Sequence, residues 1–145
     1  MTKYTDYYVT FQEIPDEISL TFTISNCQFN CFGCHSPWLS QDVGKDLSAD
    51  IDEVLLKYKD MYSCVCFMGE GNDVESLLRL LPKIKVKTAI YSGSDIIQDW
   101  MYNFDYIKVG KYIKELGGLD SGKSNQKLYK NVDRNLVEIT KKLQK

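Results

Sequence analysis

Residues 63–71 read Ser-Cys-Val-Cys-Phe-Met-Gly-Glu-Gly, a nearly unbroken apolar run that ends in a glycine-rich turn. A short apolar run bounded by turn residues is typical of a strand buried in a parallel sheet. The following residues predict a helix, because Asn72 or Asp73 can cap it and Pro82 can end it. Its apolar stripe consists of Val74, Leu77, Leu78 and Leu81. This stretch is therefore one strand, turn and helix of an α/β protein.

The same pattern recurs on both sides of this unit. Strands are predicted at 18–24, 85–91 and 105–109, where β-branched and aromatic residues dominate. Ser48 can cap a second helix, and a short helix is predicted around 96–101. The second helix has an apolar stripe of Ile51, Val54, Leu55 and Tyr58. Strands that alternate with short helices imply right-handed parallel βαβ units, and hence an α/β protein with either an open sheet or a partial barrel. The predicted fold class is α/β, a compact partial (βα) barrel of parallel strands with outer helices.

The length and charge of the chain limit the classes of function. The chain has 145 residues and a formal net charge of −2, which fits one domain over 1–145 and argues against a nucleic-acid or membrane partner. No stretch of about 18 apolar residues is available for a membrane span. The polar, tyrosine-rich segment Met1–Val9 lacks the features of a secretory signal, which predicts a cytoplasmic protein.

The pattern weakens in the C-terminal segment 110–145. Its glycines flank a polar stretch around Ser124-Asn125-Gln126, for which docking of a protein substrate and a solvated turn are equal alternatives. A last strand is predicted at Leu128–Tyr129. Arg134–Lys145 is basic and fits either a closing helix or a closing strand.

The five cysteines fall into two groups that need different explanations. Cys64 and Cys66 lie inside the apolar run, and their spacing of two places both on one face of the predicted strand. We interpret them as core cysteines. The other three lie among loop-forming residues, and a cytoplasmic chain is not expected to pair them in disulfides.

Three cysteines with C-x3-C-x2-C spacing follow the strand predicted at 18–24. They number one fewer than the four thiolates that close a structural zinc or iron–sulfur site. In a [4Fe–4S] cluster held by Cys27, Cys31 and Cys34, the fourth iron is open to the amino and carboxylate groups of S-adenosylmethionine. One electron passed into the sulfonium then yields a 5′-deoxyadenosyl radical, which removes a hydrogen atom from an inert C–H bond.

A zinc site with His35 as the fourth ligand is the alternative. Adjacent residues such as Cys34 and His35 rarely turn both side chains toward one tetrahedral metal, which favours the cluster without excluding zinc. His35 is the one histidine of the chain, so a Cys-His or Ser-His-Asp hydrolase would have to use it. Support of the cluster from the second layer of residues is the better interpretation of His35.

The run at 27–37, Cys-Gln-Phe-Asn-Cys-Phe-Gly-Cys-His-Ser-Pro, resembles the cluster loop of radical S-adenosylmethionine enzymes. Within that superfamily it is most similar to the activating proteins of anaerobic (class III) ribonucleoside-triphosphate reductase, which have Gly before the third Cys, as Gly33 is here. The resemblance covers roughly residues 10 to 130. Further segments that carry it are 14–18, 66–69, 91–93, 104–108, 115–120 and 124–126.

The resemblance implies an oxidoreductase with two cofactors. The cluster loop at 26–36 supplies Cys27, Cys31 and Cys34 as ligands of one [4Fe–4S] cluster, and the second cofactor is S-adenosylmethionine. Gly69-Glu70-Gly71 resembles the Gly-Gly-acid element that receives the amino group of S-adenosylmethionine, although Met68 or Glu70 departs from that pattern. Ser92 and Gly93 are expected to line the same site.

The resemblance also implies the target and the partners. The activase generates a glycyl radical on the large subunit of the anaerobic ribonucleoside-triphosphate reductase and receives electrons from a donor such as flavodoxin. Two alternatives stay open: a radical enzyme with another protein or peptide target, and a non-catalytic zinc or iron–sulfur binding module.

Overall fold

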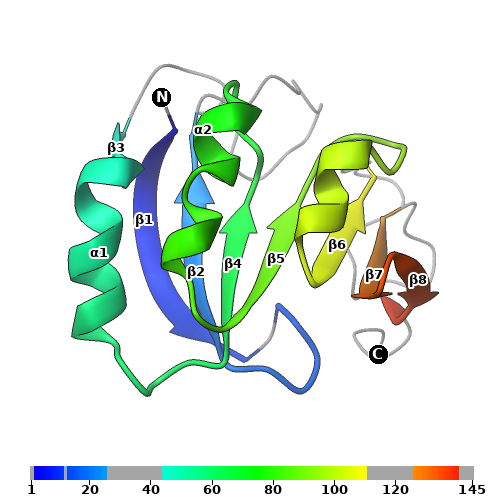
Figure 1. The fold of residues 1–145 in the computed structure, drawn as a ribbon, viewed down its shortest axis with the longest axis horizontal. Helices are drawn as coiled ribbons and strands as arrows, with labels where there is room; N and C mark the ends of the chain where they lie inside the picture. Colours follow the sequence, from blue (N-terminus) through cyan, green and yellow to red (C-terminus); the bar gives the residue numbers. More distant parts are fainter. Residues whose placement is uncertain (1, 12, 26–43, 111–125, 141–145) are drawn as a thin grey trace.

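A single mixed β-sheet forms the centre of the fold (Figure 1). The computed structural model describes residues 2–11, 13–25, 44–110 and 126–140. Within them, eight strands follow the order β3-β1-β2-β4-β5-β6-β7-β8. The strands are β1 (Lys3–Thr10), β2 (Ser19–Ile24), β3 (Lys45–Asp46), β4 (Cys64–Met68), β5 (Lys87–Tyr91), β6 (Tyr106–Val109), β7 (Lys127–Val132) and β8 (Asn135–Glu138).

Parallel pairing is confined to the middle of this sheet. The strands β2, β4, β5 and β6 pair in parallel, and Leu20, Val65 and Thr88 share one row across the first three. The outer pairs β3–β1, β1–β2, β6–β7 and β7–β8 are antiparallel. The α/β class is confirmed at the level of a mixed α/β fold, but the expectation of a sheet made of parallel strands is wrong at both edges.

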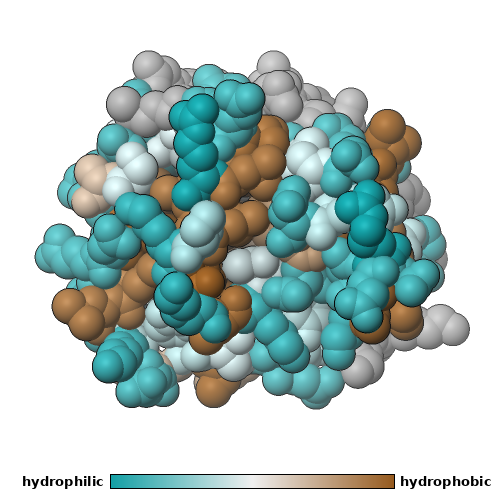
Figure 2. Space-filling view, in the orientation of Figure 1, coloured by the Kyte–Doolittle hydropathy of each residue, from teal (hydrophilic) through white to brown (hydrophobic). Residues whose placement is uncertain are grey.

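The helices pack on one face of the sheet (Figure 1). They are α1 (Leu47–Lys57) and α2 (Val74–Leu78), with the 3-10 turns η2 (Leu81–Lys83) and η3 (Asp99–Asn103). The main core lies between them and the sheet; its largest fully buried side chains include Phe22, Phe67, Phe104, Leu47, Ile51 and Leu77. Figure 2 shows this helix-covered face, where hydrophilic side chains surround strips of apolar ones. No described helix is both long enough and apolar enough to cross a membrane.

A second, smaller cluster lies on the opposite face of the sheet. Side chains alternate along β4, so Val65 and Phe67 belong to the main core whereas Cys64 and Cys66 belong to the second cluster. Both cysteines are fully buried, which confirms their interpretation as core residues. Burial raises the pKa of Cys64 to about 12 and that of Cys66 well above its ordinary value, so both thiols stay protonated.

Both outer parts of the sheet differ from the expectation. Strand β1 occupies most of the segment 1–9, where no strand is predicted from the sequence. The irregularity between Tyr4 and Asp6 breaks the simple alternation of side chains that would indicate a strand. At the other edge, the predicted strand Leu128–Tyr129 lies inside the longer strand β7. The closing element is the strand β8, which forms a hairpin with β7.

The helices begin and end at residues that differ from those predicted. Asp46 rather than Ser48 caps α1, because the Asp46 carboxylate accepts hydrogen bonds from both the amide and the hydroxyl of Ser48 (3.0 and 2.8 Å). Asp73 caps α2 as one of the two candidates. Helix α2 ends before Pro82, which lies inside η2, and the helix predicted around 96–101 is η3.

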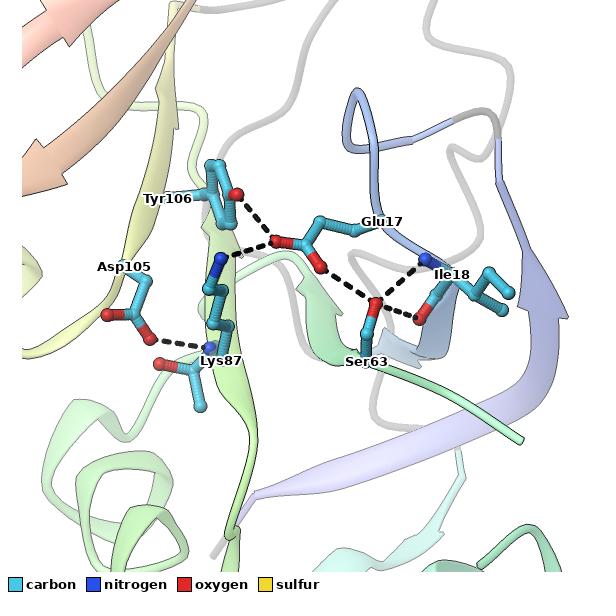
Figure 3. A network of polar contacts seen from close by, with 7 residues as sticks. Glu17, Ile18, Ser63, Lys87, Asp105 and Tyr106 are labelled. Carbon is cyan, nitrogen blue, oxygen red and sulfur yellow. Dashed lines mark hydrogen bonds and ion pairs between the residues drawn. The ribbon is translucent and has the colours of Figure 1, made fainter. Parts of the chain in front are cut away.

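A buried carboxylate joins the amino ends of the parallel strands (Figure 3). Glu17 accepts hydrogen bonds from Tyr106 Oη (2.6 Å) and Ser63 Oγ (2.7 Å), and its Oε2 lies 3.1 Å from Lys87 Nζ. Burial by itself raises the pKa of Glu17, but the hydrogen bonds from Tyr106, Ser63 and Lys87 outweigh it and lower the pKa below its ordinary value. Glu17 therefore connects the chain before β2 to the starts of β4, β5 and β6.

Replacement of this carboxylate should destabilise the protein in a pH-dependent way. Glu17→Gln is expected to lower the free energy of unfolding by about 1–3 kcal/mol at pH 7, because the amide loses the charge that Lys87 faces and turns a donor toward other donors. Since the pKa of Glu17 is lowered by folding, its contribution is full above the unfolded pKa of about 4.3 and is lost as the pH falls through the folded pKa.

Urea unfolding of both proteins between neutral and acidic pH measures this difference. Asp52→Asn is the matched control, because Asp52 pairs with Lys83 on the surface and its side chain is 71% exposed; we expect a change below about 0.5 kcal/mol. Equal stability of Glu17→Gln and the unmodified protein at pH 7 would contradict the assigned role.

Candidate functional site

The candidate site lies at the carboxyl ends of β4 and β5. Met68 and Tyr91, the last residues of these strands, are paired in the parallel register, and the Gly69 amide donates to the Tyr91 carbonyl (2.9 Å). The turns that follow the two strands therefore lie side by side. In open α/β sheets, this is the edge at which ligands bind. The structure brings together the two segments selected from the sequence, Gly69-Glu70-Gly71 and Ser92-Gly93.

A buried hydrogen bond joins the two turns. The Ser92 hydroxyl donates to a carboxylate oxygen of Glu70, and the Ser92 oxygen accepts from the Ser94 amide (3.0 Å). All three residues are buried; Glu70 is 3% exposed. Burial raises the pKa of Glu70, and the hydrogen bond from Ser92 opposes part of that effect. Glu70 is therefore an acidic group held in a low-dielectric position, as is common at functional sites.

Two glycines allow the turn after β4 to pass close to β2. Gly69 and Gly71 have φ values of +110° and +67°, in the region that favours glycine. A Cβ at Gly71 would lie 3.1 Å from Ile24 Cγ2 and 3.2 Å from the Ser25 carbonyl oxygen. The turn is thus seated directly against the carboxyl end of β2.

Cys27, Cys31 and Cys34 lie outside the described residues, and His35 does too. The described residues on either side of that segment, Ser25 and Gly44, lie against each other, since a Cβ at Gly44 would be 2.9 Å from Ser25 Oγ. Ser25 also contacts the turn at Gly71. The chain therefore leaves for the cysteine motif, and returns from it, beside the Gly69–Gly71 turn. The described residues themselves contain no group of three or more potential metal ligands from His, Cys, Asp and Glu.

Lys108, which was not among the site residues predicted from the sequence, and Gln126, from the polar stretch at 124–126, also reach this edge. Lys108, on β6, is 8% exposed; its Nζ lies 3.5 Å from the Ser92 carbonyl oxygen and 5.5 Å from the centre of the Tyr91 ring. Gln126 donates to the Gly110 carbonyl (3.4 Å). The available signal for Lys108 was a single charge inside the apolar strand Tyr106–Val109. Ser124 and Asn125, which precede Gln126, lie outside the described residues.

The polar groups of the site fit a ligand that carries an ammonium group. In the part of the chain that the structure describes, the Glu70 carboxylate accepts one hydrogen bond, from Ser92, whereas a carboxylate has about four acceptor positions. The glycines on either side of Glu70 leave the adjacent main chain without side chains. A carboxylate with acceptor positions left over, beside main chain that bears no side chains, is able to receive an ammonium group.

Comparisons with known proteins add no assignment to this site. No protein-family model, no curated protein and no solved structure matches the chain. The chemistry of the site is therefore inferred from its own residues.

Replacement of Glu70 by a neutral residue should show how much burial of its charge lowers the free energy of unfolding. Because the folded pKa of Glu70 is raised, its favourable contribution is full below the unfolded pKa of about 4.3 and is lost as the pH rises through the folded pKa. In the ligand-free protein, Glu70→Gln should therefore gain stability relative to the unmodified protein between pH 4 and pH 7. Urea unfolding across that range measures the gain. Glu75→Gln, with a side chain that is 85% exposed, is the control and should show none; a gain independent of pH would contradict the assignment.

The turn conformation itself can be tested at Gly71. Gly71→Ala should lower the free energy of unfolding by about 1–2 kcal/mol, because an L-residue is disfavoured at positive φ and its Cβ would approach Ile24 and Ser25 closely. Thermal or urea unfolding measures the loss. Gly93→Ala serves for comparison, because the φ of Gly93 is not positive, and it should cost less. An equal loss at both positions would mean that the backbone conformation of Gly71 is not the cause.

Proposed function

We propose that this protein is a radical S-adenosylmethionine activase that generates a glycyl radical on the large subunit of an anaerobic ribonucleoside-triphosphate reductase. The observation that carries the proposal is that the start of the cysteine motif lies close to the Gly69–Gly71 turn. The C-x3-C-x2-C motif begins two residues after Ser25, and Ser25 contacts the Gly69–Gly71 turn beside the buried Glu70–Ser92 pair. The three cysteines, which would leave one coordination position of a cluster open, thus follow directly after a segment that lies against the turn proposed to bind an ammonium group.

Cys27, Cys31 and Cys34 would hold one [4Fe–4S] cluster through their thiolates. When bound, the cluster and S-adenosylmethionine supply one-electron chemistry that ends in hydrogen-atom abstraction from a C–H bond. The protein's own residues would bind and orient S-adenosylmethionine. Glu70 offers a carboxylate to the ammonium group, Ser92 holds that carboxylate in place, and the glycines admit the ligand close to the main chain.

The described sheet supports a finer assignment of the fold. We propose that β2, β4, β5 and β6 are the parallel strands of a partial (βα) barrel with α1 and α2 outside. In support, these strands are consecutive neighbours, and the helices pack on one face of the sheet. The opposite face carries a separate cluster that includes Ile14, from the loop before β2, and Leu128, from β7.

The partners and the location follow from the same proposal. The reductase subunit presents a glycine whose backbone C–H is the target, and an electron donor such as flavodoxin reduces the cluster. Such a system operates in the cytoplasm. The resemblance in the cysteine motif, with Gly33 before the third cysteine, is what favours the reductase over other protein or peptide targets.

Anaerobic reconstitution with iron and sulfide tests the proposal. The protein should bind about four irons per chain and show an electron paramagnetic resonance signal that S-adenosylmethionine changes, because one iron lacks a protein ligand. With a strong reductant it should release 5′-deoxyadenosine, and with the reductase subunit it should produce a glycyl radical. Cys27→Ala, Cys31→Ala and Cys34→Ala should each lose the cluster.

Cys64→Ser and Cys66→Ser are the matched controls, because both cysteines are buried in the second cluster and should leave the iron content unchanged. One bound zinc, no colour and no response to S-adenosylmethionine would replace the proposal with a zinc-binding module. Release of 5′-deoxyadenosine without a glycyl radical would retain the chemistry and exclude this target.

A further inference from the structure

A groove of about 580 Å³ runs along the outer side of β1. One of its ends lies at Gly44 and Lys45, beside the start of β1, and the other lies at the C-terminal end of α1. The residues that line it are Tyr4, Thr5, Asp6, Tyr7, Gly44, Lys45, Lys57 and Tyr58. Aromatic rings and lysines therefore share one elongated hollow.

The lysines give this groove a positive character. Lys45 and Lys57 face one acidic residue of the lining, Asp6. Lys57 Nζ lies 5.6 Å from the centre of the Tyr7 ring and 5.5 Å from that of Tyr58, and neither lysine forms an ion pair within the part of the chain that the structure describes. An ammonium group over aromatic rings, with no carboxylate beside it, is available to an acidic side chain. The charge of the groove therefore favours an acidic ligand.

The main chain beside the groove favours an extended segment of a protein. Strand β3 pairs with β1 at Lys3 and Tyr4, and among the described strands none continues that pairing along Asp6–Val9. A strand edge presents main-chain donors and acceptors to a segment that adds to the sheet. The residues from Thr5 to Phe11 include neither the lysine nor the proline that would oppose such an addition.

The Gly44 end of the groove adjoins the candidate site. A Cβ at Gly44 would lie 2.5 Å from the Tyr4 carbonyl oxygen and 2.9 Å from Ser25 Oγ. Ser25 in turn contacts the turn at Gly71, and the cysteine motif begins two residues after it. A segment that fills the groove is therefore led to the edge at which the parallel strands end.

We propose that this groove and the outer edge of β1 are the docking surface for the protein that carries the target glycine. The inference rests on the proposed function and specifies how its protein substrate is held. An extended acidic segment of that protein adds to the sheet beside Asp6–Val9 and places a carboxylate against Lys57. Phe11, which is 73% exposed at the end of β1, supplies an apolar contact for the same segment.

The docked segment leaves the chemistry of the site unobstructed. Strand β2 separates β1 from β4, so a strand added outside β1 does not cover the turns that follow β4 and β5. The part of the partner that continues past Gly44 then lies over those turns, where a glycine has to be presented. Affinity for the substrate protein and reaction at its glycine therefore depend on different residues.

Hydrogen exchange on the reconstituted full chain tests the docking surface. The probe is the large subunit of the anaerobic reductase, and its addition should slow amide exchange at Asp6–Val9, because an added strand pairs with that main chain. Surface plasmon resonance should show that Lys57→Glu weakens the affinity for the large subunit at least about tenfold, since it turns a carboxylate toward an acidic segment. Phe11→Ser should weaken that affinity about threefold or more.

Lys130→Glu and Val137→Ser are the matched controls, because Lys130 and Val137 are exposed on the hairpin at the opposite edge of the sheet. Both controls should bind the large subunit as the unmodified protein does. Unchanged affinity of Lys57→Glu and Phe11→Ser, or unchanged exchange at Asp6–Val9 in the complex, would overturn the docking surface.

Cleavage of S-adenosylmethionine by the unmodified protein alone separates this inference from the proposed function. The expected result is release of 5′-deoxyadenosine without the large subunit present. If it is released while the docking results fail, this surface is wrong and the activase chemistry stands. If it is not released, the proposed function fails, and the docking surface fails with it.

Discussion

The parallel pairing of β4 with β2 and β5 is the constraint on which the rest of the structure depends. Parallel strands all end at the same edge, so this pairing alone brings Ser25, Gly69 and Ser92 together from three separate parts of the chain. It also requires connections that cross over the sheet, and α1 and α2 lie on those connections. The alternation of side chains along β4 then supplies both the main core and the smaller cluster on the opposite face.

The two ends of the parallel strands carry carboxylates in opposite electrostatic situations. At the amino ends, Glu17 has a lysine and two hydroxyl partners, and its charge is stabilised in place. At the carboxyl ends, Glu70 is buried and has one serine partner among the residues that the structure describes, and burial disfavours its charge. The first arrangement fits a structural role, because the fold itself supplies these partners of Glu17. The second leaves an acidic group ready for a positively charged ligand, which is why the candidate site is placed at that end.

The proposed activity uses one edge of the sheet. It depends on the turns that follow β4 and β5 and on the cysteine motif after β2. Antiparallel strands at the sheet margins extend the sheet without adding to the edge where the parallel strands end.

Much of the central fold and part of the site could be predicted from the sequence alone. The apolar run at 63–68, the helical spacing before Pro82, and the chemistry of Gly69-Glu70-Gly71 and C-x3-C-x2-C are local patterns, and each depends only on neighbouring residues. The sequence by itself therefore determined the α/β class, the βα units and the candidate ligands. Tertiary structure decided the antiparallel edges, the partnership of Glu17 with Tyr106, the hydrogen bond between Glu70 and Ser92, and the presence of Lys108 beside them. These depend on strand order and on burial, which arise from contacts between residues far apart in the chain and leave no periodic signal in the sequence.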